Sequence, residues 1–262
     1  MSSGPVGDAP VGHDQLLRDW DVQQAAYIAD REKRFDVILD VLDLQFGEQP
    51  FTVVDLACGP GSLGNRILDR FGDAQVVGVD YDPTLLELAR QSSPHHGKRL
   101  TLIDGDLTDP SWVSAVTDAA GGPVHAAVST TALHWLEPAQ LVSLYGQVHD
   151  LLTPNGVLLN GDHFRFDGRT RIIAGWAARH DDASQTAAFA AGAPAWDQWW
   201  DALRTAPGMA PLAVERDRRF ALRTGTPATA VDFQLAALGQ AGFRESGTVW
   251  QLLDDYVVYG VK

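Results

Sequence analysis

Hydrophobic residues near the start of the chain follow a helical spacing. Between His13 and Gln45 apolar residues recur at helical intervals among many charges, which predicts one long amphipathic helix, or two. Further along, short β-rich runs alternate with helical segments. The predicted strands are 51–57, 74–80, 99–104, 123–130 and 156–162. Helices are expected around 63–71, from Pro83 and from Pro138, since proline suits a first helical turn.

Strands separated by helices of this length imply right-handed crossovers and a parallel sheet covered on both faces. Ligands of such sheets bind beyond the carboxyl ends of the strands. The alternation stops at 163–216, where a stretch rich in Ala and Trp predicts inserted helices that form a cap over this edge. The remaining pattern predicts a strand at 213–224, a helix at 228–241 that Gly242 ends, and an antiparallel hairpin around Asp254 and Asp255.

Length, composition and charge narrow the class of protein. A chain of 262 residues can bury one sizeable core, so we expect a single domain. No apolar run approaches the roughly 20 residues that span a bilayer, and residues 1–12 lack the pattern of a signal peptide. We therefore expect a disordered lead-in at 1–12 and a soluble, cytoplasmic protein. The sequence gives no indication of the oligomeric state.

The net charge of −14 argues against binding to nucleic acid or to an acidic membrane. The longest basic cluster, Arg216 to Arg219, is short and is interrupted by Asp217. A small molecule is the expected partner. The single cysteine, Cys58, excludes an intrachain disulfide and a cysteine-cluster metal site, and it is interpreted as a small buried residue in a turn.

The stretch VVDLACGPGSLG (53–64) allows two interpretations. Gly59, Gly61 and Gly64 form the G-x-G-x-x-G pattern that holds a dinucleotide pyrophosphate at a helix N-terminus. Asp55, at the end of the preceding strand, disfavours that doubly negative ligand. A carboxylate there suits a nucleoside cofactor that carries an ammonium and a sulfonium group and no phosphate.

Two further carboxylates follow the next two strands. Asp80 can accept both ribose hydroxyls in either interpretation, so it does not discriminate between them. Asp106 lies at the mouth of the same cleft, where its carboxylate could accept a hydrogen bond from an adenine amino group. Together with Asp55, this contact favours the sulfonium cofactor.

With these motifs in this order, the chain resembles class I S-adenosylmethionine-dependent methyltransferases of the small-molecule type. VVDLACGPGSLG resembles the family's first motif, VVGVDYDPTLLELA its second, GDL its third, VSTTALHWL the loop after its fourth strand, and LLTPNGVLLNGD its fifth-strand motif. The resemblance covers about 51–162 and 228–262.

The resemblance implies a Rossmann-like α/β fold, with a seven-stranded, mostly parallel sheet whose last strand is antiparallel. The expected single domain, 13–262, comprises an N-terminal helical segment (13–46), a cofactor-binding core (51–162), an inserted helical cap (163–216) and the C-terminal part of the sheet (217–262).

The resemblance also implies S-adenosylmethionine as cofactor and S-adenosylhomocysteine as product. The residues expected to hold the cofactor are Tyr27, Asp55, Ala57, Gly59, Gly61, Asp80, Tyr81, Asp106, Leu107 and Ser129. Three of these have plainer interpretations: Asp55 as an acceptor that orients the turn, Tyr81 as a solvent-exposed side chain, and Asp106 as a helix cap.

The methyl acceptor is expected beside the ends of the fourth and fifth strands, under the cap. His134 and His163 are candidate general bases there, although either can be structural. With Asp162 they could bind a divalent metal, but no tight ligand spacing supports this, so no metal is expected. His125 is expected to be structural, and His95 and His96 to lie exposed in a polar loop.

Aromatic residues suggest the nature of the acceptor. The candidates for acceptor binding are Trp20, Trp135, Asp162, Trp176, Trp196 and Trp200. Aromatic rings there favour a hydrophobic or aromatic acceptor, methylated on O, N or C, in specialised metabolism. Ordinary packing of the cap is the alternative for at least half of these rings.

Two other functions remain open from the sequence. One is a nicotinamide-dependent oxidoreductase on a Rossmann sheet, which Asp55 and the antiparallel tail disfavour. The other is a non-catalytic module that has kept the fold to bind the cofactor.

Overall fold

The computed structural model describes residues 11–223, 225 and 229–262. The predicted lead-in up to residue 10 and the predicted helix start at 228 lie outside these residues. The helices are α1 (His13–Tyr27), α2 (Arg31–Phe46), α3 (Ser62–Arg70), α4 (Pro83–Ser92), α5 (Ser111–Ala120), α6 (Pro138–Leu151), α7 (Arg171–Ala190), α8 (Trp196–Thr205), α9 (Ala210–Phe220) and α10 (Val231–Gln240), with short 3-10 turns η1 (Pro94–Arg99) and η2 (Leu133–Trp135).

The strands form one sheet, and all five strands predicted before residue 163 are present. They are β1 (Thr52–Leu56), β2 (Gln75–Asp80), β3 (Leu100–Asp104), β4 (Val124–Thr130), β5 (Leu152–His163), β6 (Glu245–Leu252) and β7 (Asp255–Val261). Their order is β3-β2-β1-β4-β5-β7-β6. The neighbours from β3 to β5 pair in parallel, and β7 runs antiparallel to β5 and β6. The predicted seven-stranded fold and its antiparallel tail are confirmed.

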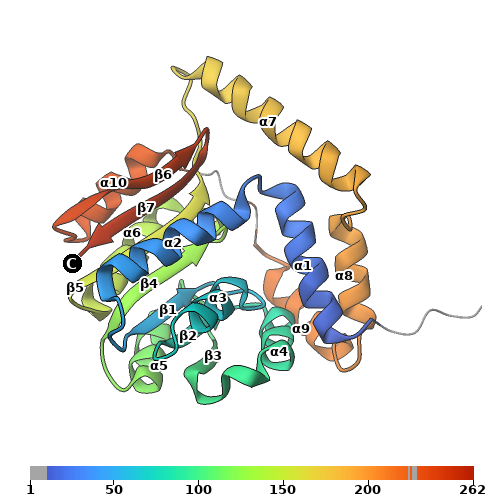
Figure 1. Cartoon of the computed structure of the whole chain (residues 1–262), viewed down its shortest axis with the longest axis horizontal. Helices are drawn as coiled ribbons and strands as arrows, with labels where there is room; N and C mark the ends of the chain where they lie inside the picture. Colours follow the sequence, from blue (N-terminus) through green and yellow to red (C-terminus); the bar gives the residue numbers. More distant parts are fainter. Residues whose placement is uncertain (1–10, 224, 226–228) are drawn as a thin grey trace, which may run out of the picture.

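Helices cover both faces of the sheet (Figure 1). On one face α2 and α3 bury apolar side chains against Val53 and Val128, and on the other α5, α6 and α10 pack against Val54 and Leu56. These strand residues are 0% exposed. Near-continuous burial is what a parallel sheet between two helical layers requires. Because both faces of the sheet are covered, polar side chains can gather only at the ends of the strands.

The inserted segment after β5 is helical, as predicted, but it extends further than residue 216. The predicted strand at 213–224 is wrong, because residues 210–220 form helix α9. Pro211 lies in its first turn, where proline needs no backbone donor. Arg216 and Arg219 on this helix pair with acids at the sheet edge. The hairpin β6–β7 supplies the last two strands instead.

The N-terminal helix and the insertion pack against each other beside the sheet. α1, α4 and α8 bury Leu16, Leu88 and Trp199 in a separate hydrophobic cluster, and the Trp199 indole N–H donates to the carbonyl of Leu16 at 2.9 Å. Helix α7 extends away from this cluster (Figure 1), and Ala177 is its one buried residue. Among the described residues, no helix is both long and apolar enough to cross a membrane.

Candidate active site

The loop after β1 is shaped by left-handed backbone and by Asp80. Ala57, Gly59 and Gly61 have φ values of 55°, 56° and 86°, and for Gly59 and Gly61 the missing Cβ removes the strain of that conformation. The Gly59 N–H donates to Asp80 Oδ2 at 2.7 Å, and the Asp82 N–H donates to Oδ1 at 2.7 Å. Asp80 at the end of β2 thus holds both the glycine loop and the start of α4.

Asp55 lies in the centre of the same edge. It is 2% exposed, its pKa is raised to about 8 by burial, and the backbone N–H of Gly64 opposes that shift. Its Oδ2 finds no hydrogen-bond partner within the described chain. Burial likewise raises the pKa of Asp80 to about 6. Two buried carboxyls at the ends of adjacent strands leave this edge suited to a cationic ligand and unsuited to a pyrophosphate.

Cys58 and Ser129 complete the buried part of the loop. Cys58 is buried, as predicted, with its sulfur against Gly78 of β2, where an added Cβ would lie 2.9 Å from it. Ser129 was expected to line the cofactor. It is 0% exposed, and its hydroxyl donates to the carbonyl of Leu56 at 2.8 Å, tying the end of β4 to the end of β1.

The predicted adenine side is covered by α9 and the residues that follow it. Arg223 lies over the ring of Tyr81 at 4.3 Å, and Nη2 of the same guanidinium donates to Asp106 Oδ2 at 2.6 Å. Asp106 also accepts hydrogen bonds from the backbone and hydroxyl of Thr108, and these partners lower its pKa although burial acts the other way. It does not cap α5, which begins at Ser111. Leu107 is half-buried beside it.

Three arginines from this segment neutralise an acidic edge that we define as Asp82, Asp104 and Asp106. Arg216 Nε lies 2.6 Å from Asp82, Arg219 makes two contacts of 2.5 and 2.9 Å with Asp104, and Arg223 holds Asp106. The sequence reasoning missed this role. Arg216 and Arg219 are spaced i, i+3 and lie on one face of α9, and this spacing was the available signal, whereas Arg223 follows the end of the helix at Phe220.

On the acceptor side, His134 and Asp162 form a hydrogen-bonded pair. His134 Nδ1 lies 2.8 Å from Asp162 Oδ1, and the His134 backbone N–H donates to Oδ2 at 3.2 Å. Burial lowers the pKa of His134, but the charge and hydrogen bond of Asp162 outweigh it and raise the pKa above its ordinary value. Asp162 is fully buried, and its pKa is held low by His134. The structure thus brings two predicted site residues together.

His163, predicted beside them, has a different environment. Burial and the charge of Arg34 lower its pKa to about 4, so it is neutral at pH 7 and a weak base. Its Nδ1 lies 3.8 Å from Asp254 Oδ2.

Arg34 is the buried cation of this region. It is 0% exposed, donates to the Thr131 hydroxyl at 2.6 Å and to the Gly161 carbonyl at 3.2 Å, and forms an ion pair with Asp255. The Arg34 side chain crosses Gly161, where a Cβ would lie 2.5 Å from it. Sequence reasoning missed Arg34 and Asp255, because 221 residues separate the two partners.

The predicted aromatic residues divide into two groups. Trp20, Trp196, Trp199 and Trp200 form an aromatic cluster between α1 and α8, with centroid distances from 4.7 Å upward, and Arg216 lies 3.8 Å from the Trp200 ring. Packing accounts for Trp199 and Trp200, which are buried, whereas Trp196 is 42% exposed. Tyr27 joins its border, where its hydroxyl accepts the Trp196 backbone N–H at 3.2 Å.

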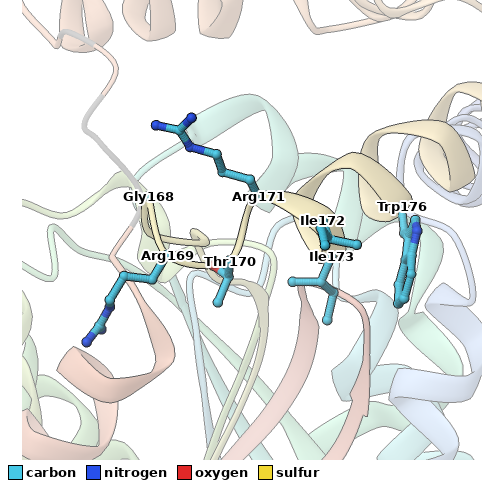
Figure 2. Close-up of a pocket in the computed structure, with 7 residues that line it drawn as sticks. All are labelled: Gly168, Arg169, Thr170, Arg171, Ile172, Ile173 and Trp176. Carbon is cyan, nitrogen blue, oxygen red and sulfur yellow. The ribbon is translucent and has the colours of Figure 1, made fainter.

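Trp135 and Trp176 lie outside this cluster and are more exposed, by 59% and 53%. Trp135 lies 5.2 Å from the His134 ring. Trp176 lines a cavity of about 350 Å³ at the start of α7, together with residues 168–173. Figure 2 shows Ile172, Ile173 and Trp176 on one side of this turn, with Arg171 pointing the other way.

The other histidines are placed as follows. His125 accepts the Thr52 N–H at 3.0 Å and packs on Phe46, which confirms a structural role. His95 is exposed as predicted, but His96 is 4% exposed, so the prediction that it faces solvent is wrong. It is buried because η1 packs against α3.

Comparison with known proteins agrees with this geometry. Residues 53–156 match the family model of the methyltransferase domain. Trans-aconitate 2-methyltransferase of Azoarcus sp. (strain BH72) is 32% identical over 139 residues, which cover 53% of this chain and 49% of that protein. The enzyme of the same name from Yersinia pestis (strain Pestoides F) is 31% identical over 144 residues, covering 54% and 49%. The chain therefore spans about half the length of these curated relatives.

Solved structures share the fold over nearly the whole chain. Magnesium protoporphyrin IX methyltransferase from Synechocystis PCC 6803, with bound S-adenosylhomocysteine, has a TM-score of 0.58 at 13% identity and 95% coverage of both chains. Human N-acetylserotonin methyltransferase, in complex with S-adenosylmethionine, has a TM-score of 0.55 at 14% identity, covering 95% of this chain and 54% of that one. Residues 53–156 thus resemble a methyltransferase domain, and the chain has the Rossmann-like fold seen in S-adenosylmethionine-dependent methyltransferases.

Proposed function

We propose that the protein is an S-adenosylmethionine-dependent methyltransferase that acts on a small molecule. The observation that carries this proposal is the pair of buried carboxyls, Asp55 and Asp80, around a left-handed glycine loop. The unpartnered Oδ2 of Asp55 fits a ligand that brings a donor or a positive charge. When bound, the cofactor supplies an electrophilic methyl group on a sulfonium.

The residues that would hold the cofactor follow the strand ends. Asp55 and the glycine loop would take the amino-acid part, and Asp80 the ribose. Asp106, Leu107 and Tyr81 would take the adenine, which requires Arg223 to yield its contact with Asp106. Tyr27 and Ser129 would act by shaping the cleft, because their hydroxyls already bond to Trp196 and Leu56.

His134 is the general base we propose for the acceptor. With its Nδ1–H donated to the Asp162 carboxylate, the neutral imidazole carries its lone pair on Nε2, which can take a proton from an acceptor hydroxyl or N–H. Asp162 fixes this tautomer and stabilises the imidazolium that forms. His163, neutral and weakly basic, would serve as a hydrogen-bonding group to the acceptor.

The acceptor we propose is hydrophobic or aromatic. The exposed rings of Trp135 and Trp176 and the exposed Ile172 offer apolar contact beside the His134–Asp162 pair and at the start of α7. A polycarboxylate such as trans-aconitate would need an accessible cation. Arg34 is buried and paired with Asp255, which argues against that role for it. A place in specialised metabolism and a cytoplasmic location stay predictions.

Calorimetry with S-adenosylmethionine, S-adenosylhomocysteine and NAD in parallel tests the cofactor. We expect the first two to bind and NAD not to bind. Titrations in two buffers of different ionisation enthalpy should also show release of close to one proton at pH 7 on binding of S-adenosylmethionine, because a nearby cation ionises Asp55. Binding of NAD alone would refute the proposal and support the oxidoreductase alternative.

Turnover separates an enzyme from a cofactor-binding module. The protein is incubated with S-adenosylmethionine and a panel of phenols, aromatic amines and trans-aconitate, and S-adenosylhomocysteine is quantified. Product with the aromatic acceptors supports the proposal. Product with trans-aconitate alone would overturn the proposed acceptor class but not the activity, and cofactor binding without any product would support the non-catalytic module.

A further inference from the structure

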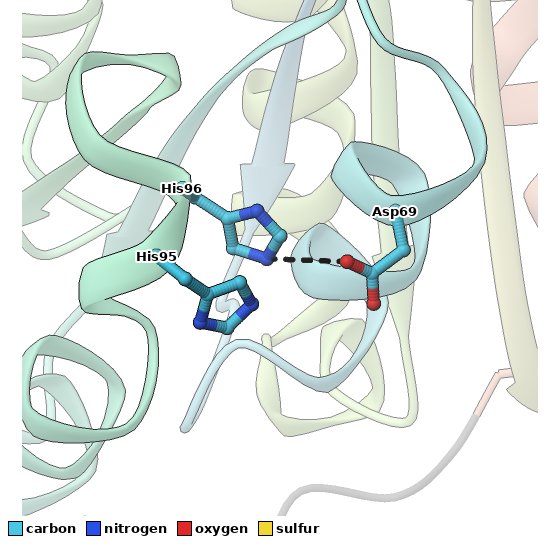
Figure 3. A group of neighbouring side chains, drawn as sticks. All are labelled: Asp69, His95 and His96. Atoms are coloured by element: carbon cyan, nitrogen blue, oxygen red, sulfur yellow. Dashed lines mark ion pairs between the residues drawn. The ribbon is translucent and has the colours of Figure 1, made fainter.

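A cluster of two imidazoles and one carboxylate lies at the edge of the sheet opposite to the edge that holds the candidate active site. It consists of Asp69 in the last turn of α3 and of His95 and His96 in η1 (Figure 3). η1 leads directly into Leu100, the first residue of β3. The cluster therefore lies at the amino ends of the strands, whereas Asp55 and Asp80 lie at their carboxyl ends.

The three side chains offer ligand atoms that all lie within 4.8 Å of one another. His96 Nε2 is 3.7 Å from Asp69 Oδ1 (Figure 3). Zinc–ligand bonds of about 2.0–2.1 Å in a tetrahedral arrangement place neighbouring ligand atoms about 3.3 Å apart. Because Asp69 and His95 are exposed, their side chains can close the remaining gap without disturbing the core.

His96 supplies an independent observation that points to a ligand. The residue is 4% exposed, yet its Nε2 is buried without a hydrogen-bond partner in the described part of the chain. A buried polar atom left unpaired costs free energy, so it needs an explanation. A metal ion bound between Nε2 and Asp69 would provide the missing partner.

We propose that Asp69, His95 and His96 bind one zinc ion or a similar borderline divalent metal. Two imidazole nitrogens and one carboxylate oxygen suit Zn²⁺, Co²⁺ or Ni²⁺ better than Mg²⁺, which prefers oxygen ligands. Three protein donors leave a position for water. Because the cluster lies away from the candidate active site, the ion would connect α3 to η1 and take no part in methyl transfer.

The backbone around the cluster is already fixed on both sides. The Ser93 hydroxyl donates to Asn65 Oδ1 at 2.9 Å, and Arg99 donates to the carbonyls of Leu68 and Phe71 at 2.9 and 3.2 Å. These contacts hold η1 against the end of α3 before and after His96. Ligand positions that are fixed in advance reduce the entropy lost on binding.

The test uses the untagged full chain, freed of metal by chelator and dialysed. Calorimetry with ZnCl₂ should give one saturable site per chain, and Zn²⁺ should raise the melting temperature while Mg²⁺ should not. Asp69→Asn and His95→Ala change exposed side chains and should each weaken Zn²⁺ binding about tenfold or more. The matched controls are Asp73→Asn, an exposed acid just after α3, and His13→Gln at the start of α1.

Two results would overturn the proposal. One is the absence of saturable Zn²⁺ binding to the wild-type chain. The other is Zn²⁺ affinity in Asp69→Asn and His95→Ala equal to that of the two controls. S-adenosylhomocysteine binding should be unchanged in both variants, which keeps this test independent of the proposed function.

Discussion

Asp55 should make the stability of the protein fall as the pH rises toward 8. Its folded pKa is about 8, against an ordinary value of 3.8, because burial penalises the charged form. The folded state therefore holds a proton that the unfolded chain has already released. The contribution of Asp55 to the free energy of unfolding is fully present below pH 3.8. It is lost, by up to about 1.4 kcal/mol per pH unit, as the pH rises from there to about 8.

The magnitude between pH 6 and pH 8 can be worked out for this carboxyl. With a folded pKa of about 8, the linkage amounts to about 2 kcal/mol lost over these two units. Asp55→Asn keeps the size of the side chain and an oxygen that can accept the Gly64 N–H, but it cannot ionise. The excess stability of the variant over the wild type should therefore grow by about 2 kcal/mol between pH 6 and pH 8.

Urea unfolding of both proteins at pH 6, 7 and 8 provides the measurement. Other groups with raised pKa values, such as Asp255, are present in both proteins and cancel in the difference. Equal pH dependence in the wild type and Asp55→Asn would refute the reasoning, because Asp55 would then be ionised throughout the range.

Three further predictions concern the acceptor side, the buried ion pair and the adenine side. His134→Gln should lower kcat by about 10²–10⁴-fold. In the wild type, kcat should rise as the pH increases through the raised pKa of His134, because the neutral imidazole is the base. If His134→Gln has the same pH–rate profile as the wild type, His134 is excluded as the base. Arg34→Met should lower the free energy of unfolding by about 3–5 kcal/mol, because the Asp255 carboxylate stays buried without its partner. Adding Asp255→Leu to this variant should restore much of the lost stability, as measured by urea unfolding. A double variant no more stable than Arg34→Met would contradict the pairing. Arg223→Ala should tighten S-adenosylhomocysteine binding in calorimetry by releasing Asp106, and weaker binding would show that Arg223 supports the cofactor.

The core of the fold was predictable because its pattern is local. The runs that became β1 to β5 are apolar and β-branched, and Pro83 and Pro138 mark the first turns of α4 and α6. Asp55 and Asp80 could be placed at one edge because parallel strands end together. The order of these motifs sufficed to predict the architecture and the candidate cofactor residues.

The features that the sequence did not predict depend on contacts between residues that are distant in sequence. Residues 213–224 combine apolar positions with alternating charge, and this local pattern does not by itself distinguish a strand from a helix. Helix α9 is explained by pairing with Asp82 and Asp104, more than a hundred residues earlier. The burial of Arg34 depends equally on Asp255 at the far end of the chain. Long-range ion pairs leave no periodic signal.

The aromatic cluster between α1 and α8 has a consequence for the dynamics of the protein. Its packing is separate from the two cores on the faces of the sheet. We therefore expect the N-terminal helix and the insertion to lose their mutual packing while the sheet stays folded, as one cooperative unit of lower stability. Backbone amides of α1 and α8 should exchange with solvent together and sooner than those of β1 and β4.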